Sequence, residues 1–260
     1  MIRSIFLDID GTLVSLKTHQ IPRSTVEALT SAKERGVGIY ISTGRPLAII
    51  NNIGAISHLI DGYITTNGAL CVVKGKTVYC NPIPQEDVDA IMTDSTEKGY
   101  ACLIAGERDI ILKNENQIFY DVFVEQLNVK NIDPKRPLST LDGQHILQFS
   151  PFIKSSYEQE LMQKMPHCIS GRWHPEFTDI TSKQADKGKG LLKMAEYLGL
   201  DISETMAFGD GGNDISILRQ AGIGVAMGNA GQNVKEVADY ITTSVDEDGI
   251  KNALMHFGVI

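Results

Sequence analysis

Residues 4–14, Ser-Ile-Phe-Leu-Asp-Ile-Asp-Gly-Thr-Leu-Val, are the stretch from which the fold of this chain can be worked out. The apolar run before Asp8 is rich in β-forming side chains and predicts a buried strand. Asp8 and Asp10 follow that run at once, although an unpaired carboxylate in a buried place is strongly disfavoured. In open α/β sheets the carboxyl ends of strands are where ligands bind. The pattern therefore favours a cation-binding or reactive edge, and an ordinary Asp-Gly turn is the alternative.

The composition is that of a globular chain without a nucleic-acid or membrane partner. Its 260 residues carry a formal net charge of −8, and no stretch is strongly basic, which argues against nucleic acid and anionic membranes. No apolar run approaches the ~20 residues that a membrane span needs. The four cysteines are scattered and form no CxxC motif, and such cysteines are typically reduced residues of a protein core. We therefore expect a cytoplasmic protein that is a monomer or a weak homo-oligomer.

Strand and helix patterns alternate over the first 80 residues. The expected elements are a helix over 22–36, a strand over 37–41, a helix from Pro46 over 47–53, a strand over 63–66 and a hairpin over 69–80. The second strand ends at Ser42-Thr43-Gly44-Arg45, so hydroxyl groups and an arginine lie at a second strand end. This βαβα order predicts a parallel sheet with helices on both faces.

The pattern changes at Asn81-Pro82-Ile83-Pro84, where two prolines indicate a linker. Helices and short paired strands follow in an α+β order, and we expect one face of their sheet to be left uncovered. The α/β alternation returns at Lys187, with a helix over 188–198 and a strand over 205–208. The sequence therefore predicts a Rossmann-like, doubly wound parallel-sheet core (1–82 and 182–260) with an inserted α+β cap domain (83–181).

Polar side chains recur where the predicted core strands end or a helix begins. They are Asp8, Asp10, Thr43, Lys187, Asp210 and Asp214. An acidic pocket with hydroxyls and one lysine suits Mg²⁺, which prefers oxygen ligands, together with a phosphoryl group whose charge the cations neutralise. Each signal also has a plainer explanation: Thr43-Gly44 can be a turn, Lys187 has neighbouring lysines as rivals, and residues 209–214 can form a capped turn.

Four motifs stand in the order found in one known family. DIDGTL (8–13), STGR (42–45), the Lys187-Gly188 helix start and GDGGND (209–214) resemble the haloacid dehalogenase-like phosphohydrolases. The insertion between the second and third motifs resembles the Cof-type group with a type IIB cap, which includes bacterial sugar-phosphate phosphatases. The likeness continues through GVAMGNA (224–230) and Asp248-Gly249-Ile250.

The resemblance implies a role for each matching residue. Asp8 is expected to attack phosphorus and form an aspartyl-phosphate, and Asp10 to act as general acid and then base. Mg²⁺ is expected to bind the Asp8 carboxylate, the Asp10 backbone carbonyl and Asp210. Asp214 is expected mainly to support these ligands. The expected phosphate-binding residues are Gly11, Ser42, Thr43, Gly44, Lys187 and Asn213.

The cap is expected to select the leaving group. Arg45 lies just past Thr43 and is expected to reach across toward the cap and contact the substrate. Arg172, Trp173 and His174 combine an aromatic face with hydrogen-bonding groups, a mixture that suits a sugar, although a lone tryptophan in a hairpin is as often part of a core.

The sequence thus predicts a Mg²⁺-dependent phosphatase for a small phosphorylated metabolite, most of all a hexose or pentose phosphate. Three alternatives remain open: a sugar-phosphate transferase or mutase, a phosphatase for pyridoxal phosphate or flavin mononucleotide, and a non-catalytic sensor. Phosphate release without an acceptor separates the first from a phosphatase. A preference for flat aromatic leaving groups marks the second, and binding without turnover marks the third.

Overall fold

The computed structural model describes residues 1–126, 129 and 132–260, except for the side chain of Trp173. Its contacts divide the chain into two compact units. The core unit consists of Met1–Gly44, Asn51–Cys80 and Asp186–Ile260, and the insert unit of Arg45–Ile50 and Asn81–Ala185. Within the described part of the chain, no helix is both long enough and apolar enough to cross a membrane.

The core unit is built on one sheet of eight strands. They are β1 (Ser4–Leu7), β2 (Gly38–Ser42), β3 (Gly62–Thr65), β4 (Leu70–Val73), β5 (Lys76–Cys80), β11 (Thr205–Gly209), β12 (Ile223–Ala226) and β13 (Tyr240–Ile241). Their order is β13-β12-β11-β1-β2-β3-β4-β5. Pairing is parallel from β13 to β3 and antiparallel in the β3-β4-β5 meander. The predicted parallel sheet and hairpin are therefore confirmed.

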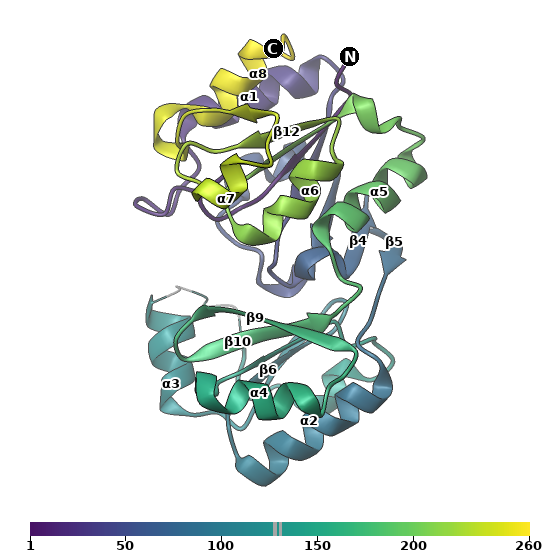
Figure 1. Cartoon of the computed structure of the whole chain (residues 1–260), viewed down its shortest axis with the longest axis vertical. Coiled ribbons are helices and arrows are strands. Elements are labelled where there is room, and N and C mark those ends of the chain that lie inside the picture. The colour runs from purple at the N-terminus through teal and green to yellow at the C-terminus, as the bar shows by residue number, and fades with distance from the viewer. Residues whose placement is uncertain (127–128, 130–131) are drawn as a thin grey trace. The chain divides into compact units, whose positions relative to one another are not determined.

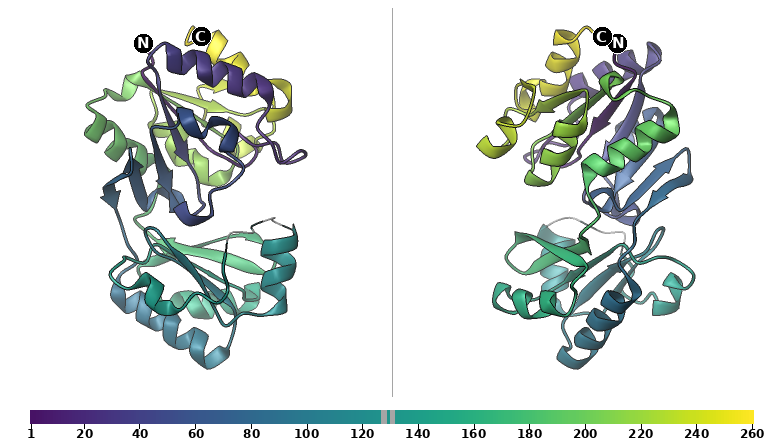
Figure 2. Two further views of the ribbon diagram at one scale, coloured as in Figure 1. Left: turned by 180° about the vertical axis from the view of Figure 1, so that it is seen from behind. Right: turned by 45° about the vertical axis from the view of Figure 1, so that its right-hand side comes forward.

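Helices cover both faces of this sheet (Figure 1, Figure 2). They are α1 (Arg23–Glu34), α5 (Lys187–Leu198), α6 (Ile215–Gln220), α7 (Gln232–Lys235) and α8 (Gly249–His256). On one face Leu191 and Met194 of α5 bury against Phe6 and Ile64 of the strands. On the other, α1 packs beside α8. The doubly wound α/β architecture follows, because both sheet faces must be shielded from water.

The helix predicted over 47–53 is wrong. The structure has only short 3₁₀ turns there, Leu47–Ile49 and Gly54–Leu59. The segment between them contains Asn52 with a positive φ of 60°. Asn and the β-branched Ile are weak helix formers, so the turn that begins after Pro46 does not extend into an α-helix. Further 3₁₀ turns are Thr66–Gly68, Leu138–Leu141, Ile202–Glu204, Gly212–Asp214 and Val245–Glu247.

The insert unit is a five-stranded antiparallel sheet in the order β7-β6-β8-β10-β9. Its strands are β6 (Cys102–Ala105), β7 (Ile110–Lys113), β8 (Gln148–Pro151), β9 (Cys168–His174) and β10 (Phe177–Ser182). The helices α2 (Gln85–Lys98) and α4 (Ser155–Gln163) pack on one face, where Ile91 and Leu161 join the buried residues Ile104 and Phe149. The α+β character of the insertion is confirmed.

The opposite face of the insert sheet is not bare, contrary to expectation. Helix α3 (Gln117–Phe119) and the π-helical turns Tyr120–Gln126 lie there. Phe119 and Phe123 bury with Leu103 of β6 in a second apolar cluster. This segment is short, so the pattern of its apolar residues does not indicate from the sequence which face of the sheet it covers.

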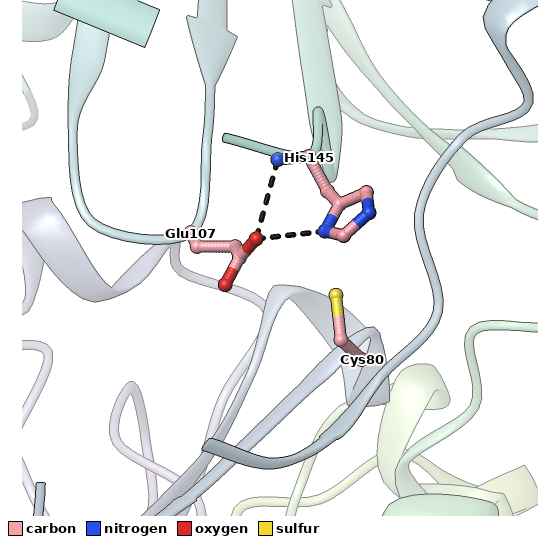
Figure 3. A group of neighbouring side chains, drawn as sticks. All are labelled: Cys80, Glu107 and His145. Atoms are coloured by element: carbon pink, nitrogen blue, oxygen red, sulfur yellow. Dashed lines mark hydrogen bonds and ion pairs between the residues drawn. The ribbon is translucent and has the colours of Figure 1, made fainter. Parts of the chain in front are cut away.

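A polar contact joins the β6–β7 turn to the segment that leads into β8 (Figure 3). Glu107 Oε1 accepts the backbone N–H of His145 at 3.2 Å, and it lies 2.8 Å from His145 Nδ1. Both residues belong to the insert unit. The pair therefore fixes the approach to the central strand of that sheet.

Candidate active site

The polar residues at the strand ends meet because of the strand order. Strand β1 pairs with β2 on one side and with β11 on the other. Asp8 therefore follows the central strand, with Thr43 after β2 and Asp210 after β11 as its neighbours. From β1 the chain proceeds to one side of the sheet and returns much later on the other. Such a reversal opens a crevice at the carboxyl ends of the strands, where ligands bind in α/β folds.

Lys187 is the buried centre of charge at these strand ends. Its Nζ donates to Asp8 Oδ1 at 2.7 Å and to Asp214 Oδ1 at 2.6 Å, and the residue is only 1% exposed. The other oxygen of Asp214 accepts the backbone N–H groups of Asp210 and Gly211, at 3.0 and 2.9 Å. Asp214 thus has both oxygens occupied, and it orients the lysine toward Asp8.

The start of α5 places Lys187 there. Asp186 caps the helix, its side chain accepting the N–H of Lys189 at 2.8 Å. The turn after β3 packs directly on this helix start at Gly68, which has a φ of +94°. A Cβ on Gly68 would lie 2.1 Å from the carbonyl oxygen of Asp186. Only glycine allows both the left-handed backbone and this close approach.

Asp210 is held from three directions. Thr12 Oγ1 donates to its Oδ1 at 2.8 Å, and Asn229 Nδ2 lies 3.2 Å from its Oδ2. Gly11 packs on the carboxylate, since a Cβ there would lie 2.2 Å from Oδ2, and its φ of +85° also favours glycine. The turn predicted at Gly11 therefore brings the first motif against the last one.

The carboxylates are crowded and short of positive charge. Burial raises the pKa of Asp8 well above its ordinary value, and the nearby Asp214 adds to this, while Lys187 opposes it. Burial also raises the pKa of Asp210 to about 6. For Lys187, the charges of Asp214 and Asp8 outweigh the effect of burial and raise its pKa, so the lysine stays charged.

This acidic group fits a divalent cation. Asp8, Asp210 and Asp214 each offer a carboxylate oxygen, and the three oxygens lie within 4.8 Å of one another. Hard oxygen ligands are those that Mg²⁺ prefers, and these three carboxylates share only the cation of Lys187 among the groups described above. Asp214 accepts three hydrogen bonds, from Lys187 and from two backbone N–H groups, whereas Asp210 accepts one on each oxygen and Asp8 accepts from Lys187. Asp8 and Asp210 therefore keep more capacity for a cation and are the better ligands.

The remaining predicted core residues lie along the neighbouring strand ends. Thr43 is buried, and its N–H donates to Ile64 O at 2.8 Å. Ser42 is also buried, and among the described residues its hydroxyl has no hydrogen-bond partner. Asp10 is exposed and pairs with Val14 in an isolated bridge, and its charge contributes to the raised pKa of Asp8.

Gly44 and Asn213 meet through a residue that the sequence did not single out. Asn213 Nδ2 donates to Asn67 Oδ1 at 3.0 Å, and a Cβ on Gly44 would lie 2.9 Å from the same oxygen. Asn67 follows β3 and has a φ of 53°. The STGR and GDGGND motifs are thus connected by an asparagine at a third strand end.

Arg172, one of the candidate sugar contacts, makes internal contacts in the insert unit. Its Nε donates to Glu158 Oε2 at 2.6 Å, and its terminal nitrogens donate to the carbonyls of Ile153, at 3.0 Å, and Pro175, at 2.9 Å. These contacts tie the β9–β10 hairpin to the start of α4. A substrate contact would require the guanidinium to give up these partners.

The other candidate substrate contacts are His174, Arg45 and Trp173. The His174 ring stacks on Phe177, with centroids 5.2 Å apart, and its Nδ1 accepts the N–H of Glu176 at 3.2 Å. Arg45 belongs to the insert unit by its contacts. Trp173 lies in β9, but its side chain is outside the described part of the structure.

Asn67, Thr12 and Asn229 are the site residues that sequence reasoning did not assign. Asn229 lies in GVAMGNA directly after β12, the strand beside β11. Asp8, Thr43 and Asp210 are candidates because they follow strands, and the same criterion also selects Asn229. Thr12 stood unnoticed inside the first motif because a threonine next to two acids is an ordinary turn residue.

Comparison with known proteins agrees with this geometry. The family model for haloacid dehalogenase-like hydrolases matches residues 5–254. A structure from a study of a trigonal-bipyramidal intermediate in a phosphoryl-transfer superfamily is 45% identical, with a TM-score of 0.89 and complete coverage of both chains. The HAD subclass IIB sugar phosphatase BT4131 is 46% identical, with a TM-score of 0.87, over 99% of this chain and 100% of that one.

A more distant relative is the 5-amino-6-(5-phospho-D-ribitylamino)uracil phosphatase YcsE of Bacillus subtilis. It is 27% identical, and the match covers 98% of this chain and 96% of YcsE. The chain belongs to the haloacid dehalogenase-like hydrolases of the Cof type, and within that family it is a phosphoric monoester hydrolase. The resemblance found in its motifs is thereby confirmed.

Proposed function

We propose that the protein is a Mg²⁺-dependent phosphatase that hydrolyses small sugar phosphates through an aspartyl-phosphate on Asp8. The observation that carries this proposal is the buried Lys187, whose Nζ lies 2.7 Å from Asp8, with Asp210 on the adjoining strand end. A nucleophilic carboxylate needs a neighbouring cation to approach a negatively charged phosphate ester. The site has that arrangement within a single unit of the chain.

Asp8 and Asp210, with the backbone carbonyl of Asp10, would hold Mg²⁺, and Asp214 would stand behind them. Bound there, the ion would neutralise charge on the phosphoryl oxygens as phosphorus is transferred. This assignment is supported by the closeness of the three carboxylates, whose oxygens lie within 4.8 Å of one another.

The proposed reaction has two steps at phosphorus. Asp8 attacks phosphorus, the bond from phosphorus to the ester oxygen breaks, and Asp10 protonates that oxygen as it leaves. Water then attacks the same phosphorus, Asp10 accepts its proton, and the bond to Asp8 breaks to release inorganic phosphate. The proposed donors to the phosphate oxygens are Ser42, Thr43, Lys187, Asn213 and the backbone at Gly11 and Gly44.

Sugar phosphates are proposed as substrates because BT4131, a sugar phosphatase, is similar over nearly the whole chain. Arg45 remains a candidate contact to the leaving group, whereas the internal contacts of Arg172 suit a structural role better. The likeness to YcsE keeps a second candidate open, a phosphatase for cofactor-like metabolites with a flat ring. Action in the cytoplasm, as a monomer or weak homo-oligomer, stays a prediction.

The proposal is tested by measuring phosphate release from a panel of metabolites with Mg²⁺. Hexose and pentose phosphates are compared with pyridoxal phosphate, flavin mononucleotide and p-nitrophenyl phosphate, without an added acceptor. We expect the highest kcat/KM with a sugar phosphate, loss of turnover with EDTA, and recovery with added Mg²⁺. Preference for the flat cofactors would contradict the substrate class, and a need for a sugar acceptor would indicate a transferase. Turnover that persists after metal removal would contradict the metal site.

A further inference from the structure

Asn229 connects three segments of the core unit through one side-chain amide. Its Nδ2 donates to the backbone carbonyl of Gly11 at 2.9 Å and lies 3.2 Å from Asp210 Oδ2. Its Oδ1 accepts the N–H of Val245 at 3.0 Å. The three contacts reach the loop after β1, the residue after β11 and the 3₁₀ turn Val245–Glu247 that precedes α8.

These partners fix the orientation of the amide. Val245 offers an N–H and so requires an acceptor, whereas Gly11 O and the Asp210 carboxylate require a donor. Turning the amide over would place its oxygen against two acceptors and its NH₂ against a donor. The observed orientation is therefore the only one that satisfies all three groups, and it directs a donor at the acidic cluster.

Asp210 gains a definite orientation from this contact. Thr12 donates to one oxygen of the carboxylate and Asn229 to the other, so the group cannot rotate freely. A carboxylate oxygen accepts more than one contact, so each oxygen keeps capacity for a cation. Because the same Nδ2 also holds Gly11 O, the segment that carries Asp8 and Asp10 is tied to Asp210.

We propose that Asn229 is a positioning residue for the metal site: it sets the place of Asp210 relative to the Asp8–Gly11 segment. The inference rests on the proposed Mg²⁺ site and adds a residue to which no role has been given. Groups that orient metal ligands without touching the metal typically contribute 10–100-fold to affinity. Asn229 is predicted to act in this way, and not as a contact to phosphate.

The fold should survive loss of the amide. Asn229 is exposed, and its neighbours are held by backbone hydrogen bonds, Gly228 N to Thr243 O at 3.0 Å and Ala230 N to Met227 O at 2.9 Å. These bonds do not involve the side chain. Asn229→Ala should therefore still fold and melt within several degrees of the parent protein, because one of the lost hydrogen bonds is exposed and the other two are only partly buried.

The chain offers a matched control in Asn252. Its Nδ2 donates to Thr243 Oγ1 at 2.8 Å and to Glu247 O at 3.1 Å, so it supports the same turn that Asn229 holds through Val245. Among the described residues, the side chain of Asn252 makes no hydrogen bond to Asp210 or Gly11. Asn252→Ala thus disturbs the turn and leaves the contacts of the Asp210 carboxylate intact.

The experiment measures Mn²⁺ binding to the full chain by electron paramagnetic resonance, with Mg²⁺ as competitor. Asn229→Ala should weaken metal binding by about 10–100-fold, and Asn252→Ala should leave it within about two-fold of the parent protein. In turnover assays the Mg²⁺ requirement of Asn229→Ala should rise by a similar factor, and kcat at saturating Mg²⁺ should recover most of its value.

Unchanged metal binding in Asn229→Ala would overturn the inference while leaving the proposed function intact. Equal weakening in Asn252→Ala would also overturn it, because the effect would then arise from the turn. If Asn229→Ala does not fold, Asn229→Ser, whose hydroxyl is too short to span both acceptors, takes its place with the same expected result. A parent protein that binds neither ion would overturn both the metal site and this inference.

Discussion

At the scale of single residues, the site depends on a lysine that water cannot reach. Lysine is almost never fully buried unless it is paired, and Lys187 is paired with both Asp8 and Asp214. Removing one partner of a buried ion group is far more destabilising than removing an exposed pair, because the remaining charges lose their counter-ion.

Lys187→Met should therefore reduce both stability and turnover. We expect the free energy of unfolding to fall by about 3–5 kcal/mol at neutral pH, since two buried carboxylates lose their cation. Urea denaturation measures this loss, and kcat/KM for p-nitrophenyl phosphate should fall at least 100-fold, about 2.7 kcal/mol of transition-state stabilisation.

Lys193→Met on the same helix is the control. Lys193 pairs with Glu196 at 2.9 Å on the surface, where ion pairs contribute little. Its stability and turnover should match those of the parent protein. A Lys187 variant that behaved like this control would contradict the central place given to the lysine.

The chemistry of a site residue decides whether the sequence alone reveals it. Asp8, Lys187 and Asp210 stand out because charged groups beside buried strands need a reason. Asn229 and Asn67 are neutral and common in turns, so their partners become visible only in three dimensions. Arg172 shows the converse, because an arginine near an aromatic residue looks like a ligand contact until its carbonyl partners are known.

At the scale of elements, the start of α5 is placed by one glycine of the turn after β3. Gly68 must have a positive φ, and its Cα lies against the backbone of Asp186. Gly75, in the β4–β5 hairpin, also has a positive φ of +78°, but a Cβ there would meet nothing within 4 Å. The two positions separate the cost of backbone strain from that of close packing.

Gly75→Ala should lower the free energy of unfolding by roughly 1–2 kcal/mol, the cost of a left-handed alanine, and leave kcat unchanged. Gly68→Ala carries the same strain and must also displace the helix start, adding about 1–3 kcal/mol. Because that displacement moves Lys187, kcat should fall as well. Equal losses of stability and unchanged kcat in both variants, by urea denaturation and turnover, would refute this account.

In the insert unit, Asp94 joins two helices. This buried residue of α2 accepts a hydrogen bond from Tyr157 of α4 at 2.8 Å and one from Lys164, directly after α4, at 2.6 Å. It accepts a third from Tyr100 at 2.9 Å. Burial alone would raise the pKa of Asp94, but the hydrogen bonds from Lys164 and the tyrosines outweigh it and lower the pKa. A lowered folded-state pKa means that the ionised group stabilises the fold above its unfolded-state pKa.

Asp94→Asn should cost about 1.5–3 kcal/mol of unfolding free energy at pH 7. Because the stabilisation is lost as pH falls through the folded-state pKa, the difference from the parent protein should shrink below about pH 4. Asp89→Asn on the exposed side of α2 is the control, because among the described residues Asp89 accepts a hydrogen bond only from Gln85. A difference that stayed constant with pH in urea titrations would argue against an ionised Asp94.

The elements that the sequence predicted best are those with strong periodicity. Helices α1 and α5 were expected close to their observed bounds because the apolar spacing and the terminal glycines agree there. The segment 47–53 combined a proline start with residues of low helix propensity, and tertiary packing of Ile49 decided against the helix. Residues 117–126 cover a face of the insert sheet because of how they pack in three dimensions, which the sequence of so short a segment does not predict.

At the scale of the whole molecule, the site is assembled from the two ends of the core sequence. Asp8 and Asp210 stand on adjacent strands, although residues 81–185 of the insert unit lie between their segments. The sequence predicted that the strand ends would share one edge. It did not predict that β11 would lie directly beside β1, because strand order depends on pairing across the whole chain.

The most direct test of the proposed chemistry is to locate the phosphoryl group during turnover. Asp10→Asn should still accept phosphate from p-nitrophenyl phosphate, whose leaving group needs little protonation, but should release it slowly because water lacks its base. Rapid acid quench with ³²P-labelled substrate, followed by peptide mapping, should place the label on Asp8, and Asp8→Asn should carry none. A label on another residue, or continued turnover by Asp8→Asn, would contradict the account.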